Sequence, residues 1–149
     1  LNNVRIGGYV NPFVYMLFIM MLPFSFSGWL LLLSAFGMGL LMDLLMSTLG
    51  LHAGAMVLMA FARPYVISLA TASREPENVN NPSLSQMGIA WWFSYVSSLV
   101  FIHHFALFLL ESFSFQQLGF TLLRIFLSTL FSVGIILLLS YFFLPKASR

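Results

Sequence analysis

Charged and polar side chains are sparse along this chain, and they divide it into long apolar stretches. Within these stretches the apolar residues follow one another without alternation, as in Leu30–Leu33, Phe105–Leu110 and Ile135–Leu139. A transmembrane β-strand would alternate apolar and polar residues, so the pattern does not favour a barrel. A helix of about 20 mostly apolar residues crosses the hydrocarbon core of a bilayer, which is about 30 Å thick. The pattern therefore predicts transmembrane helices.

Five apolar segments are the predicted helices. They cover about Asn11–Pro23, Gly28–Met46, Leu51–Thr71, Ile89–Leu110 and Leu118–Phe143. The first is short, with Asn11 as its N-cap and Pro12 at its first helical position. Three connections are short, which favours antiparallel packing of consecutive helices. We expect one all-α integral membrane domain over residues 1–149, a helical bundle with five transmembrane helices in this chain.

One segment, residues 72–88, does not fit a membrane. Its first sixteen residues read ASREPENVNNPSLSQM and contain three charged residues, two Pro and three Asn. A segment of this composition cannot bury enough apolar surface to form a core. We therefore predict a mobile polar loop, located in the cytoplasm.

The composition excludes several classes of protein. Hydrophobic residues make up 60% of the chain and charged residues only 7%. This is too few charged residues to give a soluble domain a hydrated surface. The net charge of +2 is too small for a nucleic-acid-binding surface. With no Cys, the chain has neither a disulfide framework nor a thiolate metal site. We expect contact with a lipid bilayer, no nucleic-acid partner and no cofactor.

Basic residues indicate the orientation. Arg74 lies in the polar loop, and Lys146 and Arg149 close the chain. The positive-inside rule places both regions in the cytoplasm, and the two helices between them agree with that. The first predicted helix then begins on the outside, and the chain begins with Leu rather than Met. We expect an upstream helix and six spans in the whole protein; five spans with an external N-terminus is the alternative.

Ionisable residues within the predicted helices are candidates for function, because charges inside a bilayer usually pair or face a cavity. Asp43 and His52 flank a short turn, so they could approach each other. Asp43 could be held by the N-terminal end of the helix that begins at Leu51, by His52, or by a cation on another span. With the orientation above, both residues fall toward the outer side of the membrane, and so do His103, His104, Glu111 and Arg124. We call these six residues the predicted polar cluster. We expect Arg124 to bridge either Asp43 or Glu111.

Two sharper hypotheses for this cluster have less support. Three His and two carboxylates could bind a divalent metal, but adjacent His103 and His104 diverge by about 100° around a helix, and no HExxH spacing occurs. A proton relay would need a polar path to the cytoplasm, where the sequence offers Arg63 and scattered Ser. Structural histidines are favoured over both.

Arg63 precedes Pro64, which predicts a kinked helix. Either Arg63 extends toward cytoplasmic headgroups, which we favour, or it faces a cytoplasmic partner. Small residues predict close helix contacts, within the chain rather than with a partner. They are Gly50 and Gly54, Gly37 and Gly39, and Ser128 and Ser132.

Two short motifs follow each other in the chain, Gly39-Leu-Leu-Met-Asp43-Leu44 and Leu49-Gly50-Leu-His52-Ala53. They match the G-x-x-x-D-L and L-G-x-H-A elements of the rod shape-determining protein MreD family, which the chain resembles along nearly its whole length. The supporting stretches, in chain order, are Gly8–Pro12, Phe61–Tyr65, Ile102–His104 and Leu122–Phe131. Asp43, Gly50 and His52 match the family motif and are the best candidates for its signature.

The resemblance implies a bacterial inner-membrane protein of the cell-elongation machinery. Its partners would be MreC and, indirectly, MreB, RodA and penicillin-binding protein 2. It also implies a fold similar to energy-coupling-factor transporter substrate-binding subunits, without implying transport. We expect a non-enzymatic scaffold that maintains cell shape by binding MreC and organising peptidoglycan synthesis. The alternatives are a small-molecule or lipid-binding transporter subunit with a closed polar cavity and, more remotely, an intramembrane hydrolase.

Overall fold

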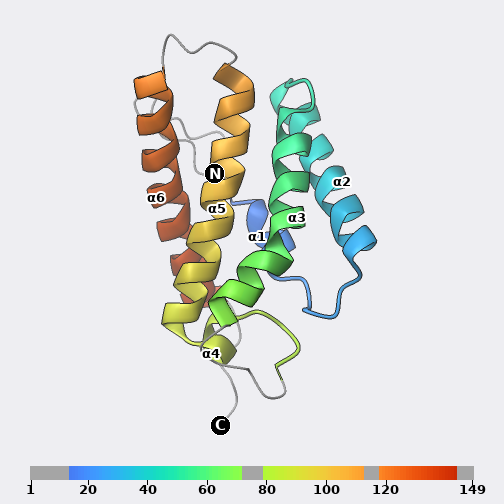
Figure 1. The fold of residues 1–149 in the computed structure, drawn as a ribbon, viewed down its shortest axis with the longest axis vertical. Coiled ribbons are helices and arrows are strands. Elements are labelled where there is room, and N and C mark those ends of the chain that lie inside the picture. The colour runs from blue at the N-terminus through green and yellow to red at the C-terminus, as the bar shows by residue number, and fades with distance from the viewer. Residues whose placement is uncertain (1–13, 72–78, 113–117, 144–149) are drawn as a thin grey trace.

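The computed structural model describes residues 14–71, 79–112 and 118–143, and all regular structure in these ranges is helical. The helices in chain order are α1 Met16–Met20, α2 Gly28–Met46, α3 Leu51–Thr71, α4 Leu84–Met87, α5 Ile89–Ser112 and α6 Leu118–Phe143 (Figure 1). Four of them, α2, α3, α5 and α6, are long and apolar enough to cross a membrane. The prediction of an all-helical, multi-pass membrane protein is therefore confirmed.

The predicted bounds agree closely with three of the four long helices. α2, α3 and α6 begin and end where the sequence predicts, and α5 continues two residues past Leu110, to Ser112. The agreement has a local cause. Each helix is a run of about 20 apolar residues, and turn-forming residues such as Gly28 and Ser47 stand at the ends of these runs.

The first predicted span, about Asn11–Pro23, does not form a spanning helix in the described residues. Asn11 and Pro12, the expected helix start, lie outside them. α1 has five residues and a length of about 8 Å, far short of the bilayer thickness. The chain leaves the helix after Met20, shortly before Pro23, which cannot donate a helical hydrogen bond. Five spanning helices are therefore not confirmed.

The four long helices lie side by side in the order α2, α3, α5, α6 (Figure 1). α3 packs against both α2 and α5, and α5 packs against α6. α2 and α3 run antiparallel, and so do α5 and α6, as their short connections predict (Figure 1). α1 lies against α2 and α3. This order leaves α2 and α6 at the two edges of the row of long helices.

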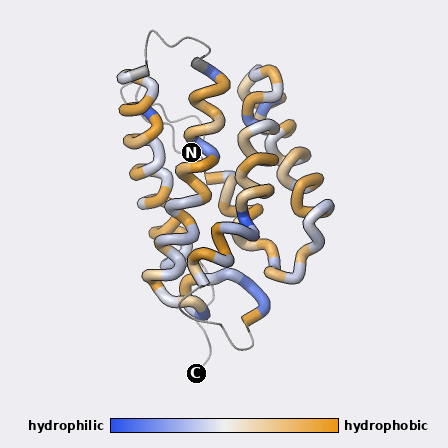
Figure 2. The backbone as a smooth tube through the Cα atoms, viewed as in Figure 1, coloured by the Kyte–Doolittle hydropathy of each residue, from blue (hydrophilic) through white to orange (hydrophobic). Residues whose placement is uncertain are grey.

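The interior is packed with aromatic, aliphatic and methionine side chains, and the outer surface is apolar as well. Trp92, Tyr95 and Met56 are fully buried, whereas Leu44 is 74% exposed and Phe126 64% exposed. Figure 2 shows the long helices mostly in white to orange, the colours of intermediate and hydrophobic residues. An apolar surface this extensive is typical of a protein surrounded by lipid.

α3 contains Pro64 and continues through it as one helix. Figure 1 shows α3 changing direction in its lower half, which agrees with the predicted kink. The proline ring removes one backbone hydrogen bond and crowds the preceding turn, so the helix bends.

The second half of the polar segment 72–88 is described by the structure. Residues 72–78 lie outside the described part, but the remainder packs against the bundle. The backbone N–H of Phe24 donates to the carbonyl oxygen of Asn80 over 3.0 Å. The short helix α4 follows, and Met87 at its end is 9% exposed. The segment expected to be a mobile polar loop therefore contains a helical turn in its described half, where Met87 packs against a surface built by the long helices.

Candidate functional site

Asp43, near the end of α2, caps the start of α3. Its side chain is buried, with 3% exposure. Oδ1 accepts hydrogen bonds from the Thr48 hydroxyl at 2.5 Å and from the backbone N–H of His52 at 3.0 Å. Oδ2 accepts from the backbone N–H of Ala53 at 3.0 Å. The first N–H groups of a helix have no intrahelical acceptor and favour an anion, so Asp43 stabilises α3 from across the turn.

The imidazole of His52 completes this arrangement. Its Nδ1 lies 3.1 Å from Asp43 Oδ1 and 3.0 Å from Thr48 Oγ1. The structure thus brings Asp43 and His52 together, as the short turn predicts. Thr48 is not among the residues predicted from the sequence. A hydroxyl residue between an acidic residue and the start of a helix could have indicated this hydrogen bond.

Gly39 allows the backbones of α2 and α3 to touch one turn below Asp43. A Cβ added at Gly39 would lie 2.5 Å from Cα of Ala53 and 2.7 Å from the carbonyl oxygen of His52, closer than atoms can approach. The turn itself uses left-handed backbone at Ser47 and Gly50, with φ of 55° and 78°. These residues and the Asp43 bonds together form a compact unit, which we call the hairpin lock. It consists of Gly39, Asp43, Thr48, Gly50, His52 and Ala53.

Gly54 is not part of the hairpin lock. A Cβ at Gly54 would meet only Leu110 Cδ1, at an ordinary contact distance of 3.6 Å. Ser128 and Ser132 of α6 are fully buried within this chain. The expectation that small residues pack within the chain therefore agrees with the structure at Gly39, Ser128 and Ser132.

His103 of α5 connects to the segment that precedes α1. It is fully buried, and its Nε2 shares a 2.8 Å hydrogen bond with the Tyr15 hydroxyl. The Tyr15 ring also meets the His52 ring edge-on, with centroids 6.2 Å apart. Tyr15 therefore connects α5 with the hairpin lock. Tyr15 and His103 are 88 positions apart, and nothing in the local sequence marks them as partners.

His104 points toward α6, away from Tyr15. Its Nδ1–H donates to the carbonyl oxygen of Val100 at 2.9 Å, and Nε2 lies 3.5 Å from Ser132 Oγ. Both His104 and Ser132 are fully buried, so this pair joins α5 to α6 in the interior. The two histidines thus diverge as their adjacent positions predict. Within the described ranges, no group of three or more His, Asp or Glu could hold a metal ion.

Arg63 lies inside the bundle, and both expectations for it are wrong. Its side chain is 2% exposed, so it neither extends to lipid headgroups nor faces a partner from the protein surface. Nε donates to the Tyr95 hydroxyl at 2.8 Å, and an Nη2 hydrogen bond goes to the carbonyl oxygen of Leu22. The Tyr95 hydroxyl donates in turn to the carbonyl oxygen of Met20 at 3.0 Å. The carbonyl groups at the end of α1 and just after it have no helical donor, and Arg63 and Tyr95 supply donors to them.

Glu111 and Arg124 form a separate ion pair at the α5–α6 end. Arg124 Nη1 lies 3.2 Å from Glu111 Oε2, and the guanidinium stands 4.5 Å above the centre of the Phe108 ring. Of the two expected bridges, the structure contains the one to Glu111. The residues of the predicted polar cluster therefore belong to three polar units. They are the hairpin lock, the histidine contacts and the Glu111–Arg124 pair.

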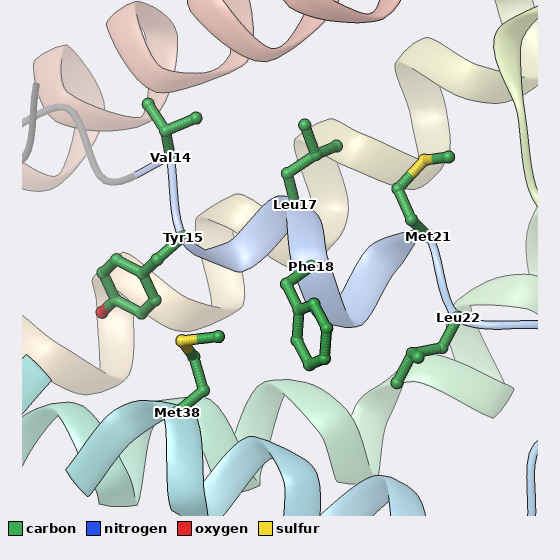
Figure 3. A pocket seen from close by; sticks show the side chains of 7 residues that line it. All are labelled: Val14, Tyr15, Leu17, Phe18, Met21, Leu22 and Met38. Atoms are coloured by element: carbon green, nitrogen blue, oxygen red, sulfur yellow. The ribbon is translucent and has the colours of Figure 1, made fainter. Parts of the chain in front are cut away.

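An apolar groove of about 450 Å³ lies between α1 and α2. Figure 3 shows Val14, Leu17 and Met21 on one side of the segment, and Tyr15 and Phe18 on the side where Met38 of α2 lies. The only side-chain polar atom among these residues is the Tyr15 hydroxyl, which is bonded to His103. This groove suits an apolar occupant better than a polar small molecule.

No protein-family model, no curated protein and no solved structure matches this chain. The resemblance to the MreD family therefore rests on the sequence motifs alone, and the likeness to transporter subunits stays a prediction.

Proposed function

We propose that this chain is a non-enzymatic membrane scaffold of the bacterial cell-elongation complex. It binds MreC and thereby helps to organise peptidoglycan synthesis by RodA and penicillin-binding protein 2 beside the MreB filaments. We place it in the bacterial inner membrane, with the 72–88 loop and the C-terminus in the cytoplasm. The resemblance also implies the six-helix fold of energy-coupling-factor substrate-binding subunits for the whole protein.

One observation carries the proposal. The residues that define the family resemblance, above all Gly39, Asp43, Gly50 and His52, converge on the hairpin lock. Gly39 allows close approach of the two backbones, and Asp43 is an anionic cap of α3. Gly50 takes a left-handed conformation in the turn, and the His52 ring bonds to Asp43. Each role is one that no other residue type fills easily. A motif with one coherent structural role supports a real family signature over a chance match in apolar sequence.

The use of the polar groups supports a scaffold over an enzyme. Asp43, Arg63 and His104 bond to groups on their own or neighbouring helices and are almost fully buried. They hold the helices in place, and the exposed faces of α2 and α6 are apolar. Apolar faces at both edges of a helix row are suited to packing against helices of other membrane proteins.

The groove between α1 and α2 gives the transporter alternative less support. It expects a closed cavity lined by the polar cluster, whereas the α1–α2 groove is open and apolar.

The test is detergent co-purification of the tagged, full-length protein from its native membrane. The scaffold proposal expects MreC and the elongation synthases to be recovered, without a bound small molecule. Recovery of an ATPase pair or of a stoichiometric small molecule would support the transporter alternative instead. As a second arm, MreC without its membrane helix should bind much more weakly. Full retention of binding would overturn contact through that helix.

A further inference from the structure

The turn between α2 and α3 is apolar and exposed. It lies at the end of the row opposite α4 (Figure 1). Leu49 in this turn is 98% exposed, and Leu44 and Leu45 in the last turn of α2 are 74% and 71% exposed. We call these three residues the hairpin tip. Adjacent residues of a helix point about 100° apart, so the apolar exposure extends around the hairpin tip and is not confined to one face.

The polar groups beside the hairpin tip are bonded within the protein. No Lys, Arg, Asp or Glu occurs between Asp43 and Arg63. Asp43 itself is buried, and its carboxylate accepts from the first amides of α3 and from the Thr48 hydroxyl. The backbone N–H of Thr48 donates to the carbonyl oxygen of Asp43 over 3.0 Å. A helix that begins in water needs no such acceptor, because water can bond to its first amides.

The lengths of the two helices set the depth of the turn. α2 has 19 residues and α3 has 21, so they are about 28 and 32 Å long, and Pro64 bends α3. The hydrocarbon core is about 30 Å thick, and the headgroup layers bring the bilayer to about 40–45 Å. Arg74, Glu75 and Glu77 follow α3 in the sequence, and charges are costly to draw into hydrocarbon. With those charges outside the core at one interface, α3 is long enough to bring the turn to the opposite edge of the core but not through the headgroup layer.

We propose that the hairpin tip binds phospholipid: its three leucines enter the edge of the hydrocarbon core, and the turn does not emerge into water. The hairpin lock then has a physical reason, because the first amides of α3 lie where water is scarce and need the carboxylate of Asp43. A second copy in the same bilayer stands beside this one, so it cannot cover the end of a hairpin that points along the membrane normal. The inference does not depend on which protein the chain binds.

The absence of Cys from the chain makes the test direct. Single cysteines replace Leu49, Leu40 on the exposed face of α2 and Asn81 in the polar segment 72–88. Each full-length variant is purified and reconstituted in vesicles of phosphatidylethanolamine and phosphatidylglycerol, with a charged maleimide on both sides of the membrane. Leu40→Cys is the lipid-facing control and Asn81→Cys the water-facing one. All three positions are exposed, so burial within the protein does not decide their labelling rates.

We expect Leu49→Cys to react several-fold more slowly than Asn81→Cys and about as slowly as Leu40→Cys. All three variants should react fully once they are unfolded in sodium dodecyl sulfate. The vesicles contain no other protein, so slow labelling there cannot come from a partner. Reaction of Leu49→Cys as fast as Asn81→Cys would overturn the inference, and protection in native membranes alone would then assign the hairpin tip to a partner protein. Protection that disappears when the protein is diluted with lipid would assign it to a second copy and also overturn the inference.

Bilayer thickness supplies a second measurement. In vesicles of lipids with shorter acyl chains, the edge of the hydrocarbon core lies closer to the bilayer centre. Leu49→Cys should then react faster, whereas Leu40→Cys, at the thirteenth of the 19 residues of α2, should stay protected. Asn81→Cys should react at one rate throughout. A rate for Leu49→Cys that does not change with acyl-chain length would show that lipid does not cover the hairpin tip.

Discussion

The guanidinium of Arg63 donates through Nε to the Tyr95 hydroxyl over 2.8 Å, inside a bundle whose outer surface is apolar. A buried arginine is costly unless its donors are satisfied. Here Arg63 Nη2 donates to the carbonyl oxygen of Leu22, and the Tyr95 hydroxyl donates to the carbonyl oxygen of Met20 at the end of α1. These buried bonds therefore hold the end of α1 and the residues after it against α3 and α5.

Loss of the Tyr95 hydroxyl should destabilise the protein. Tyr95→Phe leaves Arg63 Nε and the Met20 carbonyl oxygen without their partner, which should lower the free energy of unfolding by about 1–3 kcal/mol. The measurement is denaturation in detergent followed by circular dichroism. Tyr65→Phe is the matched control, because Tyr65 is 62% exposed and its change should have little effect. Equal stabilities would show that the Arg63–Tyr95 bond contributes nothing.

Gly39→Ala should prevent normal packing of α2 against α3. The added Cβ would lie 2.5 Å from Ala53 Cα, so the helices must separate and lose contacts along the hairpin. We expect a loss of several kcal/mol, seen as aggregation in size-exclusion chromatography. Gly37→Ala, two residues earlier, meets no atom within 4 Å and should be neutral or slightly stabilising. Normal elution of both variants would contradict the close approach.

Asp43→Asn should weaken the cap of α3. An amide of the same shape carries one acceptor oxygen in place of two, and it loses the charge that the helix N-terminus favours. The expected loss is about 1–2 kcal/mol in thermal denaturation. Glu111→Gln is the comparison, because that carboxylate is 45% exposed and its pair should contribute less than about 1 kcal/mol. A larger effect at Glu111 than at Asp43 would refute this ranking.

Charge exchange distinguishes the two bridges expected for Arg124. Glu111→Arg and Arg124→Glu should each reduce accumulation in the membrane, and the double variant should recover much of it, because the partners lie 3.2 Å apart. The exchange of Asp43 with Arg124 should not recover, since Asp43 is bonded to the first amides of α3. The readout is immunoblotting of membrane fractions. Recovery in the Asp43 exchange alone would mean that the pairing is wrong.

The features predictable from sequence were those that depend on neighbouring residues. Helix lengths follow from runs of apolar residues and the thickness of a bilayer, which is why α2, α3 and α6 begin and end as predicted. The approach of Asp43 to His52 follows from a turn of a few residues between two helices. The buried Met87 in the second half of the 72–88 segment could not be predicted, because its burial depends on a surface built elsewhere in the chain.

Only the tertiary structure decided the order of the helices, the burial of Arg63 and the partners of His103 and His104. The bonds concerned join residues 28 to 88 positions apart. In a soluble protein the apolar face of each helix would indicate the interior. Here the helices are apolar on all sides, because lipid and protein core accept the same side chains, so the sequence determined which segments cross the membrane and the tertiary structure determined which faces meet.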